Sequence, residues 1–412
     1  NDNHSLDLTY DGGHKDTGLA WKGRYYGGDM HYQYHDAPDP ASGSYNDKNR
    51  TVYQGAQGQL SFTKDFLTLT GGLDWQQHRL RGNNENGKGS AFFEKERHSS
   101  STYEVGAGFL LAKLAFWDEL LIVGGGVRQD TYAVKAGDSF TPSSSKEFDH
   151  TTPSVGVAVN PLKWLTLRGN YGESYQAPTP MQLMGGSWSA FYGRYIGNSH
   201  LKPERGEGWD AGFDMHDKAW NLGLTYFSTD YRDKIGVRPV GGDNQYYNVG
   251  GTVYYRGIEA QAGYDLGDAF AWPFMLRPYA NLTQMLECRG RGQDPAKPDS
   301  YAPMRNISDT SLAYGLQFKY PDIGLEADLR ATYYGYRKEL VYDSAAWTSD
   351  MKRAGGETVV DFFAAQTLHK WEDAGKLSLK GEVRNLTNVK HEAFANYPLP
   401  GRSFWLGLRY DY

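Results

Sequence analysis

The sequence predicts an all-β fold: a closed, antiparallel transmembrane β-barrel of about 18 strands. Three observations indicate this class. Aromatic residues make up 15% of the 412 residues, yet the mean hydropathy is -0.66. No run of about 18 apolar residues is present that could form a membrane-spanning helix. Apolar and polar residues alternate with period two, which is typical of strands between lipid and an aqueous lumen.

The alternation is clearest in two segments near the C-terminus. In residues 325–333, Leu, Ala and Tyr alternate with Glu, Asp, Arg and Thr; in 376–384, Leu and Val alternate with Lys, Ser, Glu and Arg. A soluble sandwich could contain one such strand, but the pattern recurs along the chain. The most apolar segment, 109–123, is expected to form two strands joined at 117–119. A helix there would carry Lys113 into the bilayer, which is costly.

Short turns are expected at one end of the strands and long loops at the other. The turns are expected at 27–28, 64–65, 117–119, 160–163, 217–218, 266–272, 321–322 and 372–373. The long polar stretches are 36–50, 82–100, 136–149, 177–204, 288–304 and 338–355. Periplasmic turns and longer extracellular loops are the arrangement of Gram-negative outer-membrane barrels, so we expect that location. Both termini are expected at the short-turn end.

Composition argues against several other classes of function. The net charge of -6 does not suit a nucleic-acid partner. The single cysteine, Cys288, excludes an intrachain disulfide framework and a thiolate cluster. No nucleophile elbow or His-Glu-x-x-His is present, so we expect no enzyme and no catalytic residue. The pairs Met30–His31 and Met215–His216 are neighbours on strands and point to opposite faces, so no metal site or cofactor is expected.

A series of short motifs follows in fixed order and ends at an aromatic C-terminal residue. Its members are Tyr175, Ala177 and Pro178; Leu201, Pro203 and Glu204; Asn248 and Gly250; Gly257 and Glu259; Asn385 and Leu386; Pro400, Gly401 and Arg402; and Tyr412. In order and spacing they resemble the motifs of TonB-dependent outer-membrane transporters, the siderophore and haem receptors. The resemblance covers nearly the whole chain.

The resemblance implies energy-coupled uptake of a large, scarce ligand, with a ferric siderophore or haem expected. The family has a plug domain inside a barrel of about 22 strands. No plug and no TonB-contacting motif is visible in residues 1–412, so the whole chain is expected to be barrel, starting near the family's fifth strand. The implied partners are the bilayer with its lipopolysaccharide, the iron chelate, and the TonB complex acting through a plug; a monomer is expected. The alternative is a passive, substrate-selective porin of about 18 strands.

The stretch 177–204 is the candidate ligand-binding segment, because it is long and lies between two motifs. Aromatic rings with an arginine suit a planar, anionic ligand, since rings stack and arginine pairs with anions. The candidate residues are Trp188, Tyr192, Arg194, Tyr195 and His200, with Trp347 from the stretch 338–355. The axial histidine of the family's haem receptors is missing, and Tyr192 or Tyr195 would replace it for haem. Alternatively, these aromatics belong to the interface girdle and loop packing.

Overall fold

The computed structural model describes residues 2–35, 45–86, 97–138, 144–189, 193–294, 297–343, 348–372, 374–395 and 397–411. Within these ranges, 18 strands form one sheet, and the registers of its paired strands are antiparallel. One of the 18, β17, covers only two residues. No helix among the described residues is long and apolar enough to span a membrane. The predicted all-β class is confirmed.

The elements follow each other in a simple order along the chain. The strands of the main sheet are β1 (Asp2–His14), β2 (Leu19–His35), β3 (Tyr45–Lys64), β4 (Leu67–Asn86), β5 (Arg97–Phe116), β6 (Leu121–Asp138), β7 (Ser144–Leu162), β8 (Leu165–Gln176), β11 (Glu204–His216), β12 (Trp220–Arg232), β15 (Thr252–Tyr264), β16 (Met275–Gly290), β17 (Ala302–Pro303), β18 (Thr310–Tyr320), β19 (Leu325–Tyr334), β22 (Glu357–Trp371), β23 (Gly375–Arg384) and β24 (Ser403–Asp411). The remaining elements are η1 (Lys15–Thr17), α1 (Pro180–Met184), β9 (Gly185–Ser189), β10 (Gly193–Ile196), β13 (Ile235–Val240), β14 (Asp243–Asn248), α2 (Leu266–Ala269), η2 (Pro321–Ile323), β20 (Arg337–Asp343) and β21 (Thr348–Ala354).

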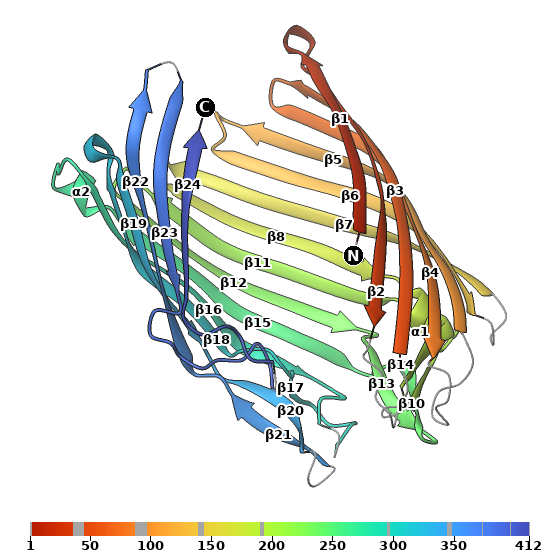
Figure 1. Ribbon diagram of the computed structural model, residues 1–412. Coiled ribbons are helices and arrows are strands. Elements are labelled where there is room, and N and C mark those ends of the chain that lie inside the picture. Colours follow the sequence, from red (N-terminus) through yellow and green to blue (C-terminus); the bar gives the residue numbers. More distant parts are fainter. Residues whose placement is uncertain are drawn as a thin grey trace. The chain divides into compact units, whose positions relative to one another are not determined.

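The chain divides into two compact units, which are described separately. Unit 1 contains residues 1–157, 170–207 and 231–251; unit 2 contains 158–169, 208–230 and 252–412. In unit 1, β1 to β6 pair in chain order with continuous registers, and Figure 1 shows β1 to β4 side by side. In unit 2, β18, β19, β22, β23 and β24 pair in the same consecutive way.

The two faces of the main sheet differ in chemistry, as the alternation predicts. On β24, Phe404, Leu406 and Leu408 point to one face and are 74%, 73% and 67% exposed. On β23, Lys380 and Glu382 point to the other face of the sheet, which they share with their register partners on β24, Gly407 and Trp405. Exposed leucines are costly in water but not in lipid. We call these the apolar face and the polar face.

The expected turn within 109–123 is confirmed. β5 ends at Phe116 and β6 begins at Leu121. Trp117, Asp118 and Glu119 all have positive φ, which reverses the chain within the connection. Lys113 lies close to Glu119, with 3.6 Å between the charged groups.

The turn expected at 27–28 is wrong, because Gly27 and Gly28 lie inside β2. A Cβ on Gly28 would meet the Tyr53 hydroxyl oxygen at 2.5 Å, so glycine here makes room for a ring rather than for a turn. The first turn is η1, which ends at Gly18 with φ 68. The strands also extend into several stretches expected as loops, because polar residues occupy both faces of the strands near their long-loop ends.

The prediction that both termini lie at the short-turn end is also wrong. β1 runs toward the short turn η1, so Asp2 lies at the long-loop end of unit 1. In unit 2, Lys376 pairs with Asp411, so β24 ends beside the short connection that precedes β23. The two termini lie at different ends of their strands because the number of long strands among the described residues is odd. β17 covers only two residues and does not run the length of its neighbours.

Glycines under tyrosine rings offer a stability test within one strand. A Cβ on Gly55 would lie 2.4 Å from the Tyr26 ring, whereas a Cβ on Gly58 would meet nothing within 4 Å. We expect Gly55→Ala to lower the free energy of unfolding by about 1–3 kcal/mol, because the ring must move. Gly58→Ala is the matched control and should not destabilise the protein. Urea unfolding in lipid vesicles measures both, and equal losses would contradict the packing described.

Candidate functional site

Arginine–carboxylate pairs form on the polar face, both between strands and within one strand. In unit 1, Arg128 on β6 donates to Asp74 on β4 at 2.5 Å and to Asp130 at 2.9 Å. In unit 2, Arg168 on β8 donates to Asp214 at 2.7 Å and lies 3.2 Å from Asp210, both on β11. Each guanidinium therefore has two carboxylate partners, so this face is polar while its charges are largely neutralised.

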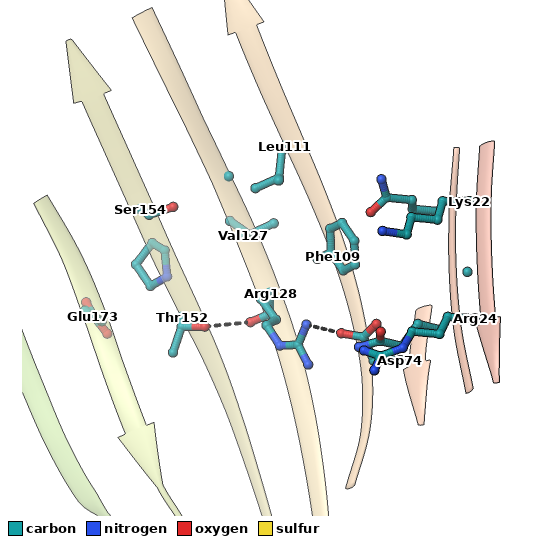
Figure 2. Close-up of a pocket in the computed structure, with 15 residues that line it drawn as sticks. Lys22, Arg24, Asp74, Phe109, Leu111, Val127, Arg128, Thr152, Ser154 and Glu173 are labelled. Atoms are coloured by element: carbon teal, nitrogen blue, oxygen red, sulfur yellow. Dashed lines mark hydrogen bonds and ion pairs between the residues drawn. The ribbon is translucent and has the colours of Figure 1, made fainter. Parts of the chain in front are cut away.

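A hollow of about 510 Å³ lies on this face of unit 1. Figure 2 shows Arg128 reaching from its strand toward Asp74, with Phe109 and Lys22 along the same wall. Thr152 donates to the backbone oxygen of Arg128 at 3.4 Å. The wall thus combines hydrogen-bonding groups with apolar surface from Phe109, which suits contact with another polypeptide.

The long-loop end of unit 1 contains a second cluster, built from motif residues. β8 ends at Gln176, and Ala177 and Pro178 are buried behind it. Thr179 then caps α1 by a capping box with Gln182, since the Thr179 hydroxyl accepts from the Gln182 amide at 3.3 Å and the Gln182 side chain accepts from Thr179 at 2.8 Å. This cap fixes where the chain turns away from the sheet.

The buried core at this end joins α1 to the main sheet. Leu183 of α1 and Leu201 are 2% and 1% exposed, and they pack with Val134 of β6 and Tyr246 of β14. Tyr195 packs against this core, with its ring centroid 5.8 Å from that of Tyr246. Burial raises the pKa of Tyr246, and Tyr195 adds to the shift, so this phenol stays protonated at neutral pH.

The side chains of Asn248 and Glu204 hold residues 202 and 231–235 at the long-loop end of unit 1. The Asn248 side chain accepts from the Lys202 amide at 2.9 Å and donates to the Lys202 oxygen at 2.9 Å and the Asp233 oxygen at 2.7 Å. Glu204 accepts from the Ile235 amide at 2.6 Å and from the Tyr231 hydroxyl at 3.2 Å. The motif residues are therefore structural: they anchor the segments that carry the long-loop end.

These anchors hold a small four-stranded sheet in the order β13, β14, β10, β9. β10 and β14 are parallel, and the other neighbours are antiparallel. Trp188 and Arg194 are directly opposite each other in the β9–β10 register. The described residues of the expected ligand-binding segment thus form the helix α1 and the strands β9 and β10.

The candidate ligand residues are distributed unevenly. Trp188 and Arg194 are paired in the small sheet, whereas Tyr195 pairs with Ser187 and belongs to the other face, where it is half-buried against Tyr246. His200 is exposed, and its amide donates to Asn198 at 2.9 Å. Tyr192 and Trp347 lie outside the described residues. A role in ligand binding stays a prediction for all six.

The other motif residues shape the strands and turns of both units. In unit 1, Tyr175 stacks on His150 at 4.4 Å. In unit 2, Gly257 lies at a bulge beneath the Phe227 ring. Asn385 is 3% exposed, and its amide donates to the oxygens of Val389 at 2.8 Å and Pro400 at 3.4 Å.

Several motif residues are exposed or form minor contacts. Gly250, Glu259 and Leu386 are exposed, and Pro203 is half-buried. Gly401 and Arg402 approach Asn388, whose side chain accepts from the Arg402 amide. Tyr412 lies outside the described residues. Sequence reasoning missed Tyr246, although its position two residues before the Asn248 motif was a signal for it.

Comparison with known proteins defines the class first. The sequence model described as "TonB dependent receptor-like, beta-barrel" matches residues 1–386. Its match extends over nearly all of the sheet, and the polar and apolar faces agree with a transmembrane barrel. The chain belongs to the TonB-dependent receptor family, whose members are Gram-negative outer-membrane proteins.

The probable TonB-dependent siderophore receptor PirA of Acinetobacter baumannii is 23% identical over 396 residues, covering 84% of this chain and 48% of PirA. Among solved structures, the copper transporter OprC has a TM-score of 0.76 at 17% identity, covering 98% of this chain and 64% of OprC. The ferric citrate transporter FecA has a TM-score of 0.72 at 13% identity, covering 98% of this chain and 60% of FecA. The chain thus spans about half the length of the curated relative, and the structural likenesses confirm the fold.

Asn248 offers a test of the anchoring role. We expect Asn248→Ala to speed hydrogen exchange of β10, β13 and β14, because three hydrogen bonds are lost, with a cost of about 1–3 kcal/mol. The strands β1 to β6 should keep their protection. The control is Gln245→Ala in the same strand, where one exposed bond to Arg238 is lost. Equal exchange in the two variants would contradict the role of Asn248.

Proposed function

We propose that this chain is the barrel of an outer-membrane receptor that takes up a large, scarce ligand, a ferric siderophore or haem, with energy supplied through TonB. The observation that carries the proposal is the family match over residues 1–386. PirA, which aligns with 84% of this chain, is described as a probable siderophore receptor. The HasR structure, which is also similar, is described as a complex with a hemophore and heme.

The long-loop end is the proposed binding surface. Its small sheet is held by buried contacts and a capped helix, so little order has to be gained when a ligand binds. Trp188 and Arg194, opposite each other on β9 and β10, are proposed to contact an aromatic, anionic chelate with Tyr195 and His200. Tyr192 and Trp347 are proposed as further contacts. Recognition and transport, rather than catalysis, are the proposed activities.

The polar face is proposed to surround a plug. Residues 1–412 are proposed to form the barrel domain, with the plug supplied from outside this range. A surface of paired arginines such as Arg128 and Arg168 offers hydrogen bonds without a large unpaired charge, so a polypeptide can pack there and still move. The proposed partners are the TonB complex through this plug, the lipid bilayer with its lipopolysaccharide, and the iron chelate; the proposed state is a monomer.

Uptake in cells tests the proposal. Cells that carry the protein should accumulate iron from a panel of radiolabelled ferric siderophores and haem, and the accumulation should stop when TonB is deleted. A passive porin would pass its substrate equally with and without TonB. TonB-independent uptake would therefore contradict the proposal and support the porin alternative.

Variants of the small sheet test the binding surface. We expect Arg194→Ala to weaken binding of the transported chelate by about tenfold, because a charge-assisted contact is lost. Arg238→Ala is the comparison in the same small sheet, since Arg238 stacks on Tyr247 at 5.0 Å, and it should change affinity less. Fluorescence titration measures both, and an unchanged affinity for Arg194→Ala would remove this residue from the site.

A further inference from the structure

A group of arginines and tyrosines in unit 2 lies on the apolar face rather than on the polar face. On β15, Tyr254 and Arg256 alternate in step with Ile258, Ala260 and Ala262, while Gly257 and Glu259 belong to the opposite face. The register agrees, because Tyr254 is directly opposite Arg289 and Arg256 is opposite Glu287. A bulge between Arg256 and Gly257 shifts the phase of β16, which brings Glu287 and Arg289 to this face.

The position along the strand places this group at the edge of the membrane. From Tyr264 at the short-turn end to Tyr254, β15 rises about 33 Å at about 3.3 Å per residue. A strand tilt of about 40° reduces this to about 25 Å, which is the height of the apolar band of such barrels. Tyr254 and its neighbours therefore lie level with the lipid headgroups of the outer leaflet, outside the barrel wall.

Arg256 is held by carboxylates. It forms ion pairs with Glu287 and, at 3.4 Å, with Asp230 on β12, and its Nε donates to Ser228 at 3.3 Å. Its guanidinium also lies 4.9 Å from the centroid of the Tyr254 ring. Arg256 is thus fixed in place and supports the ring of Tyr254.

Arg289 and Arg291 each have fewer ion-pair and hydrogen-bond partners among the described residues than Arg256 has. Arg289 shares Glu287 at 2.5 Å, and its side chain is still 54% exposed. It lies 5.6 Å from the Tyr254 ring and 5.5 Å from the Tyr301 ring, and these two rings stack at 5.8 Å. Arg291 lies 5.4 Å from the Tyr301 ring. Its Nε is buried and has no hydrogen-bond partner among the described residues.

We propose that Arg289, Arg291, Tyr254 and Tyr301, supported by Arg256, bind a phosphate group of the phosphorylated glycolipid of the outer leaflet. We call these five residues the arginine–tyrosine patch. Among the described residues, these three guanidinium groups have ion pairs with two carboxylates, Asp230 and Glu287, so a positive charge and free N–H donors remain for an anion. Guanidinium groups bind phosphate in a bidentate manner, and tyrosine rings suit the headgroup region. The inference rests on the outer-membrane location and not on the identity of the transported ligand.

The test compares lipid retention in variants of the protein isolated from outer membranes. Native mass spectrometry measures how much lipopolysaccharide stays bound at increasing collision energy. The test variant is Arg289→Gln with Arg291→Gln, which keeps a polar side chain with N–H donors and removes both charges. The control is Arg330→Gln, because Arg330 has the same exposure of 54% but lies 3.5 Å from Asp361 on the polar face.

We expect the double variant to bind the glycolipid about 25-fold more weakly, since each of the two basic residues contributes about fivefold near an anionic surface, and the control to bind it normally. Dephosphorylated lipid should bind the unaltered protein as weakly as the double variant binds native lipid. Equal retention by double variant and control, or equal binding of dephosphorylated lipid, would overturn the proposal. Loss of chelate binding with unchanged lipid retention would place the patch in the ligand site and overturn it as well.

Discussion

The constraint on which the structure depends is that no backbone N–H or C=O group can face lipid without a hydrogen-bond partner. A membrane β-protein satisfies it only by pairing each strand along its whole crossing. The long, continuous registers of unit 1, from β1–β2 to β5–β6, meet this requirement. Period-two alternation, short turns and antiparallel order follow from it, because each strand must return beside its predecessor with one face in lipid.

Once the backbone is paired, the polar face becomes available for function. Its arginines are placed between carboxylates, as with Arg128 of β6 between Asp74 on β4 and Asp130 on its own strand. Such pairs contribute little stability when they are exposed to water. Their value here is that they keep the wall hydrated or in contact with a polypeptide while avoiding a strong field of one sign. The apolar face has the opposite role, and near the long-loop end of β15 and β16 it also carries the charged groups of Arg256, Arg289 and Glu287.

The sequence predicts the parts of the fold that lipid imposes. The apolar face of β24 and the turn at Trp117–Glu119 were predictable because contact with lipid forces alternation and forbids a charged helix. The turn predicted at Gly27 and Gly28 was wrong, because the sequence alone does not distinguish a glycine that makes room for the Tyr53 ring from a glycine that forms a turn. The strands also continue into several of the expected loops, where water contacts both faces and alternation loses its meaning.

The candidate site was only partly predictable, for a related reason. The motifs around Pro178, Leu201 and Asn248 located the long-loop end correctly, because their spacing follows the strands. The small sheet could not be predicted, since it depends on contacts far apart in sequence: Leu183 with Val134, and Asn198 with the Tyr246 oxygen at 3.0 Å. No local pattern in 177–204 indicates that it pairs with residues beyond 235.

Ion conductance of the protein isolated from outer membranes tests the central claim most directly. The claim is that a plug fills the space bounded by the polar face and that transport needs external energy. In planar lipid bilayers without ligand or TonB, the account predicts no steady channel current. A steady current that a substrate blocks would contradict it, because an open, water-filled lumen is the property of a passive porin.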